Sequence, residues 1–271
     1  MLAPKKSLGQ NFLRDENVAR KIVKSLRLRP NDAVVEIGPG QGSLTKHLCA
    51  ATTRLVGIEI DDRAIAVLRE TLGSGVTLIH SDVLNISLED LARQVGVRIR
   101  VVGNIPYNIT SDILFWLFGG RRVLEDATLM VQLEVARRLV ARPRTKEYGI
   151  LSVFTQFYAK PELLFKVSRN SFYPKPDVDS AVMHFEFPAT LLSCDESLFR
   201  SVVRSTFGKR RKTLRNGLRY MGFSDHELDS LAFDLKRRPE SLSLEEFLAL
   251  TKLLEPFQAM ASAQPPGTKA E

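Results

Sequence analysis

The chain has few cysteines and histidines and no long apolar run. Among its 271 residues there are only two cysteines, Cys49 and Cys194, which argues against a disulfide framework and a cysteine-rich metal site. The four histidines are scattered without ligand spacing, so we expect no metal. No segment reaches the roughly 18 to 20 apolar residues that cross a bilayer. We therefore expect a soluble, cytoplasmic protein that does not act at a membrane.

Acidic residues are in the minority. Lysine and arginine number 39 against 31 aspartates and glutamates, which gives a formal net charge of +8 and favours a polyanionic partner. No acidic residue occurs between residues 200 and 219, where eight are basic, and a second basic cluster spans residues 137–146. Such runs are either a solvated helix face or a surface that contacts phosphates, and we prefer the latter.

Alternating periodicity indicates a parallel sheet with helices on both faces. Short β-rich runs at residues 33–37, 54–60, 76–80, 99–102 and 127–132 are separated by helix-like segments. A helix is predicted at residues 15–27, capped by Asp15. Residues 149–187 keep a β character without long helices, which predicts a closing antiparallel hairpin.

The pattern after Pro188 is purely helical, with predicted helices at residues 196–207, 212–220, 225–233 and 243–254. We therefore expect a catalytic domain at residues 1–188 and a small helical domain at residues 189–257. The polar and small residues at 258–271 predict a disordered tail.

A glycine-rich turn follows the first strand of the predicted sheet. In VVEIGPGQGSLT, residues 34–45, Gly38, Gly40 and Gly42 allow a sharp turn and close approach of a ligand. A dinucleotide fingerprint would place a third glycine where Ser43 stands, which weakens an NAD or FAD interpretation. A turn without any ligand stays open as the alternative.

Acidic residues follow the next two strands. Glu59 lies about 20 residues beyond the glycines, where a carboxylate accepts from ribose hydroxyls. Asp61 and Asp62 are expected to cap the next helix, and Asp82 either meets an adenine amino group or caps a turn. The glycine loop contains no lysine or arginine, so the pattern favours S-adenosylmethionine over ATP or NAD.

The segment GNIPYNIT, residues 103–110, resembles the NLPY-type signature of the rRNA adenine N6,N6-dimethyltransferases. Further blocks resemble that family in the same order: KKSLGQNFL (5–13), MVQLEVARRLVARP (130–143), KEYGILSV (146–153), SFYPKPDVDSAV (171–182) and FGKRRKTLRNGL (207–218). The resemblance is strongest to the KsgA-type branch, which acts on small-subunit rRNA. Arg144, where the family commonly has glycine, and Ser168-Arg169 depart from its pattern.

The resemblance implies a Rossmann-like class I methyltransferase fold that uses S-adenosylmethionine. Implied cofactor residues are Gln10, Asn11, Leu13, Gly38, Gly40, Glu59, Ile60, Asp82, Val83 and Asn104. The first three belong to an N-terminal segment that folds over the cofactor. The basic run, and not the resemblance, supplies the expected RNA-binding residues, which are Arg204, Lys209, Arg210, Arg211, Lys212 and Arg215.

Chemistry is expected at the GNIPYNIT segment. An adenine amine is a poor nucleophile because its lone pair is delocalised into the ring. If the Asn104 side-chain oxygen and the Ile105 carbonyl accept its hydrogens, the lone pair can be directed at the sulfonium methyl without a covalent intermediate. Pro106 fixes the backbone, while Tyr107 and the family's second aromatic, Phe172, would stack on a flipped base. The less favoured alternative is that Phe172 is ordinary core.

The expected function is dimethylation of two adjacent adenosines in the loop of the 3′-terminal helix of 16S rRNA, within a 30S subunit or its precursor, by a monomer. One alternative is an Erm-type enzyme that methylates an adenosine of 23S rRNA. The other is a largely non-catalytic assembly or transcription factor on the same fold, against which the intact Glu59, Asp82 and Asn104 set argues.

Overall fold

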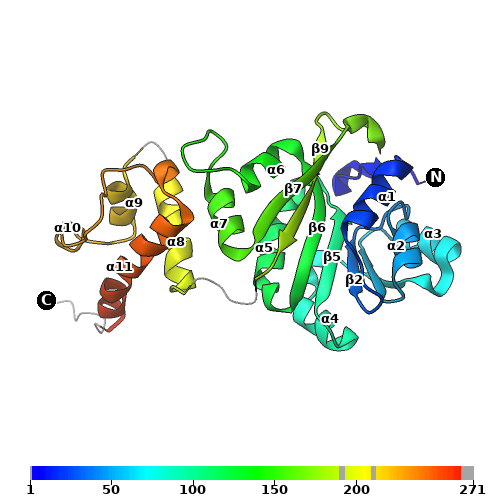
Figure 1. Ribbon diagram of the computed structural model, residues 1–271, viewed down its shortest axis with the longest axis horizontal. Coiled ribbons are helices and arrows are strands. Elements are labelled where there is room, and N and C mark those ends of the chain that lie inside the picture. The colour runs from blue at the N-terminus through cyan, green and yellow to red at the C-terminus, as the bar shows by residue number, and fades with distance from the viewer. Residues whose placement is uncertain (1, 189–192, 209–211, 264–271) are drawn as a thin grey trace, which may run out of the picture. The chain divides into compact units, whose positions relative to one another are not determined.

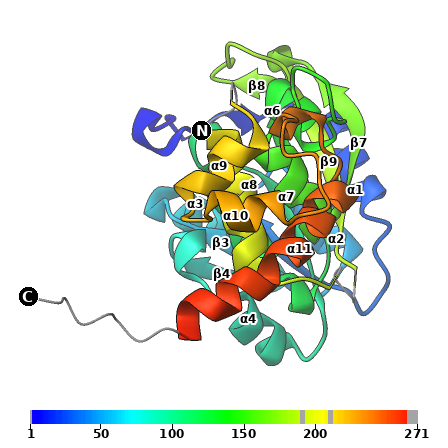
Figure 2. The same ribbon diagram turned by 90° about the vertical axis from the view of Figure 1, so that its left-hand side faces the viewer.

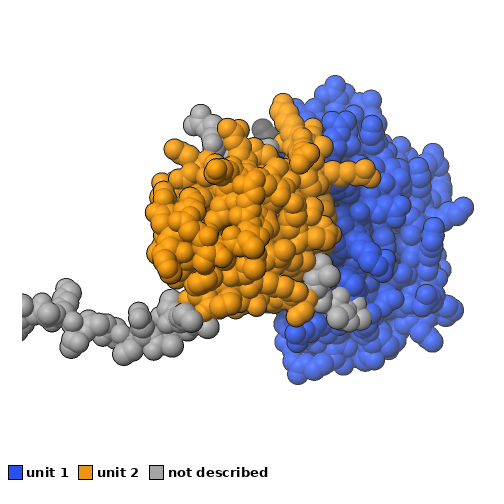
Figure 3. Space-filling model, turned by 60° about the vertical axis from the view of Figure 1, so that its left-hand side comes forward, with its two compact units in different colours: residues 1–140, 158–189 blue, residues 141–157, 190–271 orange. Residues whose placement is uncertain are grey.

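A computed structural model describes residues 2–188, 193–208 and 212–263 (Figure 1). The chain divides into two compact units, which are coloured separately in Figure 3. Unit 1 contains Met1–Val140 and Tyr158–Ala189, and unit 2 contains Ala141–Phe157 and Thr190–Glu271. The chain thus enters unit 2 twice, and the second entry lies next to the boundary predicted at residue 188. The assignment of catalysis and RNA binding to separate domains stays a prediction.

Unit 1 is built on a seven-stranded sheet with the order β4-β3-β2-β5-β6-β9-β7. Its strands are β2 (Ala33–Ile37), β3 (Leu55–Glu59), β4 (Thr77–His80), β5 (Ile99–Asn104), β6 (Leu124–Gln132), β7 (Lys160–Val167) and β9 (Ser180–Glu186). The neighbours from β4 to β6 pair in parallel, and β9 is antiparallel to both β6 and β7. The parallel sheet and its antiparallel end were both predicted. All five β2 residues are buried, as expected when helices cover both faces.

The helices of unit 1 connect successive strands (Figure 1). They are α1 (Glu16–Ser25), α2 (Thr45–Ala51), α3 (Asp62–Leu72), α4 (Leu88–Val95), α5 (Thr110–Gly119) and α6 (Leu133–Leu139). Asp15 caps α1 as predicted, because its carboxylate accepts from the backbone N–H groups of Asn17 and Val18. Ile22 of α1 and Leu48 of α2 join an apolar cluster with Val102 of β5, so these two helices pack on one face of the sheet.

A second, two-stranded sheet holds the N-terminal segment. Strand β1 (Phe12–Leu13) pairs antiparallel with β8 (Phe172–Tyr173), and Leu13 lies opposite Phe172. Short 3-10 helices include η1 (Lys6–Leu8) before β1 and η4 (Tyr107–Ile109) after β5. A segment at the start of the chain is therefore tied to one about 160 residues later.

One predicted β segment is helical. Helix α7 (Ile150–Tyr158) lies within residues 149–187, where β structure without long helices was expected. The run ILSVFTQFY is rich in β-branched and aromatic residues, which favour strands by local preference. Its buried Val153, Phe154 and Phe157 have helical spacing, and Phe157 stacks on Phe199 at 4.3 Å between ring centroids. Packing therefore overrides the local preference.

The described residues of unit 2 form helices and loops without a strand (Figure 2). Its remaining helices are α8 (Glu196–Gly208), α9 (Leu214–Tyr220), α10 (Asp225–Asp229) and α11 (Leu244–Ala263). Phe207 of α8 stacks on Phe247 of α11 at 5.8 Å. Helix α10 is shorter than predicted. Residues 258–263 continue α11, so the tail predicted there is wrong for these six residues, and residues 264–271 lie outside the described chain.

Candidate active site

A cavity of about 250 Å³ lies where β2, β3, β4 and β5 end. Its lining contains every residue predicted to bind the cofactor: Gln10, Asn11, Leu13, Gly38, Gly40, Glu59, Ile60, Asp82, Val83 and Asn104. Ile105, Pro106 and Tyr107 line it as well. The carboxyl ends of parallel strands are the usual ligand-binding edge of an open α/β sheet. The structure thus brings together five separate stretches of unit 1.

The glycine loop has the backbone that the sequence requires. Gly38, Gly40 and Gly42 have φ angles of 62°, 56° and 80°, a left-handed region that favours glycine. A Cβ atom added at Gly38 would meet no atom within 4 Å, so the space before this residue is open to a ligand. At Gly40 a Cβ would lie 3.1 Å from the Phe12 ring, which covers the loop.

Three backbone N–H groups orient the Glu59 carboxylate. Its Oε2 accepts from Gly40 N at 2.9 Å, and its Oε1 accepts from the backbone nitrogens of Ile60 and Asp61, each at 2.9 Å. Glu59 is buried, and Ile60 beside it keeps 47% of its surface exposed while lining the cavity. Asp82 accepts from Leu84 N at 3.0 Å, so it also caps a turn, as the alternative reading of its position expected.

The charge of the cavity suits a cationic ligand. Glu59 and Asp82 line it, together with Glu36, which burial keeps protonated near pH 7, and no lysine or arginine is among the lining residues. S-adenosylmethionine carries a sulfonium and an ammonium group and no phosphate, so this donor and charge set fits it. An acidic lining of this kind would disfavour the phosphates of a nucleotide.

Asn104 is the last residue of β5, and its side-chain amide has a defined orientation. Nδ2 donates to the Asn11 carbonyl at 2.8 Å, which leaves Oδ1 as the acceptor for another group. Tyr107, in the following 3-10 turn, shares a hydrogen bond with Ser180 Oγ at 2.7 Å. Burial raises the pKa of the Tyr107 hydroxyl, so it stays neutral near pH 7.

Phe172 is not at the cavity. It is 4% exposed and belongs to the apolar cluster beneath α1 and α2, whereas Tyr173, the next residue, is 45% exposed. Alternation along β8 explains the difference, because successive side chains of a strand point to opposite faces. The ring of Tyr173 lies 3.9 Å from the guanidinium carbon of Arg14. Phe172 therefore packs in the core of this structure, and its predicted stacking role stays a prediction.

The sequence interpretation overlooked Glu36. This β2 side chain lines the cavity, is 1% exposed, and its Oε2 has no hydrogen-bond partner. Burial raises the pKa of Glu36 to about 8, and the nearby charge of Glu59 adds to the effect. The available signal was a glutamate within a strand that is otherwise apolar and buried on both faces.

The predicted RNA-binding residues have different environments. Arg204 and Lys212 are exposed, and residues 209–211, which include three of the predicted contacts, lie outside the described chain. Arg215 forms ion pairs with Asp225, at 2.8 Å, and with Asp229. Asp225 and Asp229 of α10 thus pair with Arg215 within unit 2, and the predicted contact of Arg215 with RNA stays a prediction.

Among the described residues, membrane-spanning helices and metal clusters are both absent. No helix there combines the length and apolar character that a membrane crossing requires. No group of three or more His, Cys, Asp or Glu side chains there is arranged to hold a metal ion.

Comparison with known proteins places the chain in a family. The model of the ribosomal RNA adenine dimethylase family matches residues 1–255. Ribosomal RNA small subunit methyltransferase A of Chlorobium phaeobacteroides strain BS1 is 48% identical over 257 residues, covering 94% of this chain and 95% of that protein.

Solved structures support the fold. A dimethyladenosine transferase from Plasmodium falciparum has a TM-score of 0.76 at 24% identity, covering 92% of this chain and 98% of that one. The 23S rRNA methyltransferase ErmE has a TM-score of 0.68 at 30% identity, and the match covers 90% of this chain and 100% of that one. The predicted Rossmann-like methyltransferase fold is confirmed. With a family model spanning nearly its whole length, the chain belongs to the ribosomal RNA adenine dimethylases.

Proposed function

We propose that this chain transfers methyl groups from S-adenosylmethionine to N6 of two adjacent adenosines in the loop of the 3′-terminal helix of 16S rRNA, within a 30S subunit or its precursor. The observation that carries the proposal is the position of Asn104. Its free amide oxygen lies at the cavity that also presents Glu59 and Asp82, so one site offers both a cofactor pocket and an acceptor for an amine.

The cofactor would be held by residues already oriented for it. Glu59 has each carboxylate oxygen anchored by backbone N–H groups, and its remaining lone pairs suit the ribose hydroxyls. Asp82 would accept from the adenine amino group, and Gly38 leaves room for the methionine portion. The bound cofactor would supply an electrophilic methyl group, and the chain's own residues bind it, orient it and exclude water.

Amine activation is assigned to the end of β5. The Asn104 Oδ1 and the Ile105 carbonyl accept the two hydrogens of the target amine, which favours a pyramidal nitrogen whose lone pair points at the methyl group. Tyr107 offers an aromatic face for a base taken out of its stack. For the second transfer only one hydrogen remains, so the site must accept a methyl group in place of one hydrogen bond.

The two alternatives are less well supported. The Erm-type reading rests on a neighbour with 30% identity, whereas the relative named for the small subunit reaches 48%. The assembly-factor reading does not explain why Asn104, Glu59 and Asp82 are gathered at one cavity. The exposed Arg204 and Lys212 of unit 2 are the described candidates for contacts with RNA phosphates.

The test is methyl transfer from labelled cofactor to purified, unmodified 30S and 50S particles. We expect 30S particles to be labelled on two adjacent adenosines and 50S particles to stay unlabelled. Asn104→Ala should slow single-turnover transfer on the order of 10²- to 10³-fold, with RNA binding unchanged. Asn104→Asp should be less harmful, since a carboxylate still accepts. Labelling of 50S alone would favour the Erm-type reading, and labelling of neither particle would favour the assembly factor.

A further inference from the structure

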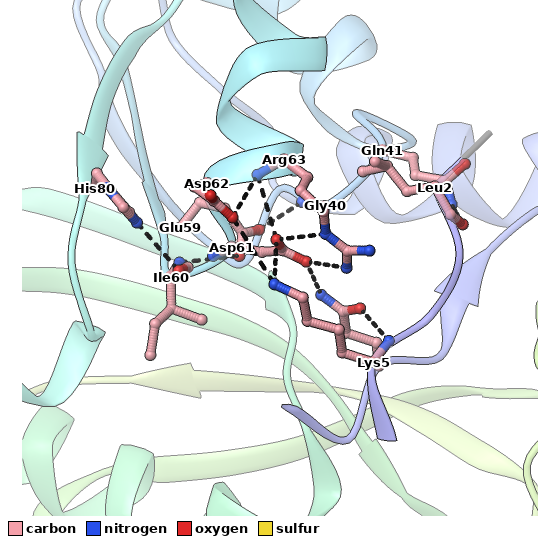
Figure 4. Close-up of polar contacts among 11 residues, drawn as sticks. Leu2, Lys5, Gly40, Gln41, Glu59, Ile60, Asp61, Asp62, Arg63 and His80 are labelled. Carbon is pink, nitrogen blue, oxygen red and sulfur yellow. Dashed lines mark hydrogen bonds and ion pairs between the residues drawn. The ribbon is translucent and has the colours of Figure 1, made fainter. Parts of the chain in front are cut away.

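Asp61 does far more than cap α3. Its side chain is fully buried, yet its carboxylate meets three side chains (Figure 4). Lys5 Nζ and Arg63 Nε donate to Oδ1, each at 3.0 Å, whereas Gln10 Nε2 at 3.0 Å and Arg63 Nη2 at 2.6 Å donate to Oδ2. The Arg63 guanidinium, followed by Gln10 and Lys5, holds the pKa of Asp61 well below its usual range. The carboxylate is therefore charged at any pH at which the protein works.

Two of these partners are remote in sequence. Arg63 is two residues away and belongs to the cap, but Lys5 and Gln10 are 56 and 51 residues away. They belong to residues 5–13, which we call the N-terminal arm. Gln10 also accepts from Lys5 N at 2.8 Å, so its amide bridges the arm backbone and Asp61. A helix cap would need neither remote donor.

The far end of the arm is fastened near the chemistry. Ser43, the residue that replaces a third glycine in the loop, donates its hydroxyl to the Leu13 carbonyl at 2.6 Å. Asn104 Nδ2 donates to the Asn11 carbonyl. Residues 7–13 line the cavity between these attachments. The arm is thus one wall of the cavity, held by Asp61 at one end and by Ser43 and Asn104 at the other.

The bond to Asn11 has a chemical consequence. The terminal torsion of an asparagine amide has broad energy minima, so nothing intrinsic to Asn104 decides whether oxygen or nitrogen faces the cavity. An N–H pointed at the target amine would donate where an acceptor is needed. The Asn11 carbonyl engages Nδ2 and leaves Oδ1 for the amine. Detachment of the arm would remove one wall of the cavity and also the bond that directs Asn104 Oδ1 toward the amine.

We propose that Asp61 is a positioning residue that latches the N-terminal arm over the cofactor cavity and, through Asn11, sets the orientation of the Asn104 amide. The proposal rests on the proposed function for its meaning in catalysis, but the latch itself can be tested without RNA. Asp61 is not among the residues that line the cavity. Its effect on methyl transfer passes through the arm.

The chain offers a matched control. Asp62 is the neighbouring carboxylate, but its side chain is 73% exposed and lies 3.8 Å from Lys5 Nζ. Asp61→Asn keeps the side-chain volume and an oxygen for the cap while removing the charge that holds the arm. Asp62→Asn makes the same chemical change at an exposed carboxylate that meets Lys5 through this longer, solvent-screened ion pair, which should contribute little. The double variant Lys5→Ala/Gln10→Ala removes the two side chains through which the arm binds Asp61 and leaves the hydrogen bonds between Asp61 and Arg63 in place.

The first measurement is hydrogen exchange in the cofactor-free protein. Asp61→Asn and the Lys5→Ala/Gln10→Ala variant should speed exchange in residues 5–13, with the sheet unchanged, whereas Asp62→Asn should match wild type. The second is the dissociation rate of S-adenosylhomocysteine, the product left when the cofactor has given up its methyl group, which cannot react further. We expect it to rise about 10- to 100-fold in both latch variants, the range for a lost charged hydrogen bond. Combined with Asp61→Asn, the arm substitutions should add little.

Single-turnover transfer at saturating cofactor separates positioning from cofactor retention. It should stay slowed in the latch variants, since saturation refills the cavity but does not orient Asn104. Unchanged exchange and dissociation in the arm-side variant would overturn the latch, even if Asp61→Asn failed to fold. Full recovery of the rate at saturation would overturn the link to Asn104. A wild-type protein that binds S-adenosylhomocysteine but methylates no ribosomal particle would refute the proposed function and leave the latch standing.

Discussion

The buried Glu36 predicts an unusual pH dependence of stability. Its pKa is about 8 in the folded chain against an ordinary value of 4.5, so between these pH values the folded state binds a proton that the unfolded state has lost. The free energy of unfolding should therefore fall as pH rises through this window, by up to about 1.4 kcal/mol per pH unit. The stabilising contribution is complete below pH 4.5 and lost above pH 8.

Glu36→Gln removes the titration while keeping the shape of the side chain. Over the window of about 3.5 pH units, stability of the variant relative to wild type should rise by at most roughly 5 kcal/mol. A constant offset from the buried amide does not affect this trend. Urea denaturation of the cofactor-free protein at pH 5, 6, 7 and 8 measures it. Glu70→Gln, an exposed change, is the control. Parallel curves for wild type and Glu36→Gln would show that Glu36 is charged when folded and refute the reasoning.

Three further outcomes follow from other parts of the chain. Glu59→Ala should weaken S-adenosylmethionine binding at least about tenfold, because hydrogen bonds to a charged group contribute roughly 1.5 to 3 kcal/mol each; unchanged affinity by calorimetric titration would contradict the cofactor assignment. Replacing Arg204 and Lys212 by Ala should reduce the slope of the logarithm of the RNA-binding constant against the logarithm of salt concentration by about 0.7 for each lost phosphate contact, without altering cofactor affinity. A slope equal to wild type would show that these two residues are only a solvated face. Arg144 has a φ of 69°, in the left-handed region. Arg144→Val should therefore lower the free energy of unfolding by about 1 to 2 kcal/mol, whereas Arg144→Gly should not. Equal losses of stability for the two variants in urea denaturation would argue against a left-handed backbone at this residue.

The features predicted best were those written in short, contiguous patterns. The strands carry continuous apolar runs because both of their faces are buried, and the acidic residues at their ends mark the cavity edge. Glycines with positive φ are likewise required by the local backbone. These features need no knowledge of the tertiary structure, which is why the sheet was predicted correctly and the predicted cofactor residues line one cavity.

The features that were missed depend on contacts between distant segments. Asp61 shows only its capping role in sequence, since its remote donors are more than 50 residues away. Helix α7 was taken for β structure because its apolar residues prefer strands until they pack on α8. Phe172 matched a family motif, and only the structure shows that its side chain lies in the apolar cluster while that of Tyr173 is exposed.

The double entry of the chain into unit 2 constrains how this protein can be recombined with its relatives. Residues 141–157 precede β7 in sequence but pack with the C-terminal helices, as the stacking of Phe157 on Phe199 shows. A hybrid cut near residue 189 would therefore pair one parent's α7 with the other parent's α8. Exchange of the C-terminal part between homologues should preserve solubility only when residues 141–157 are transplanted with it, so the exchangeable cassette is discontinuous in the gene.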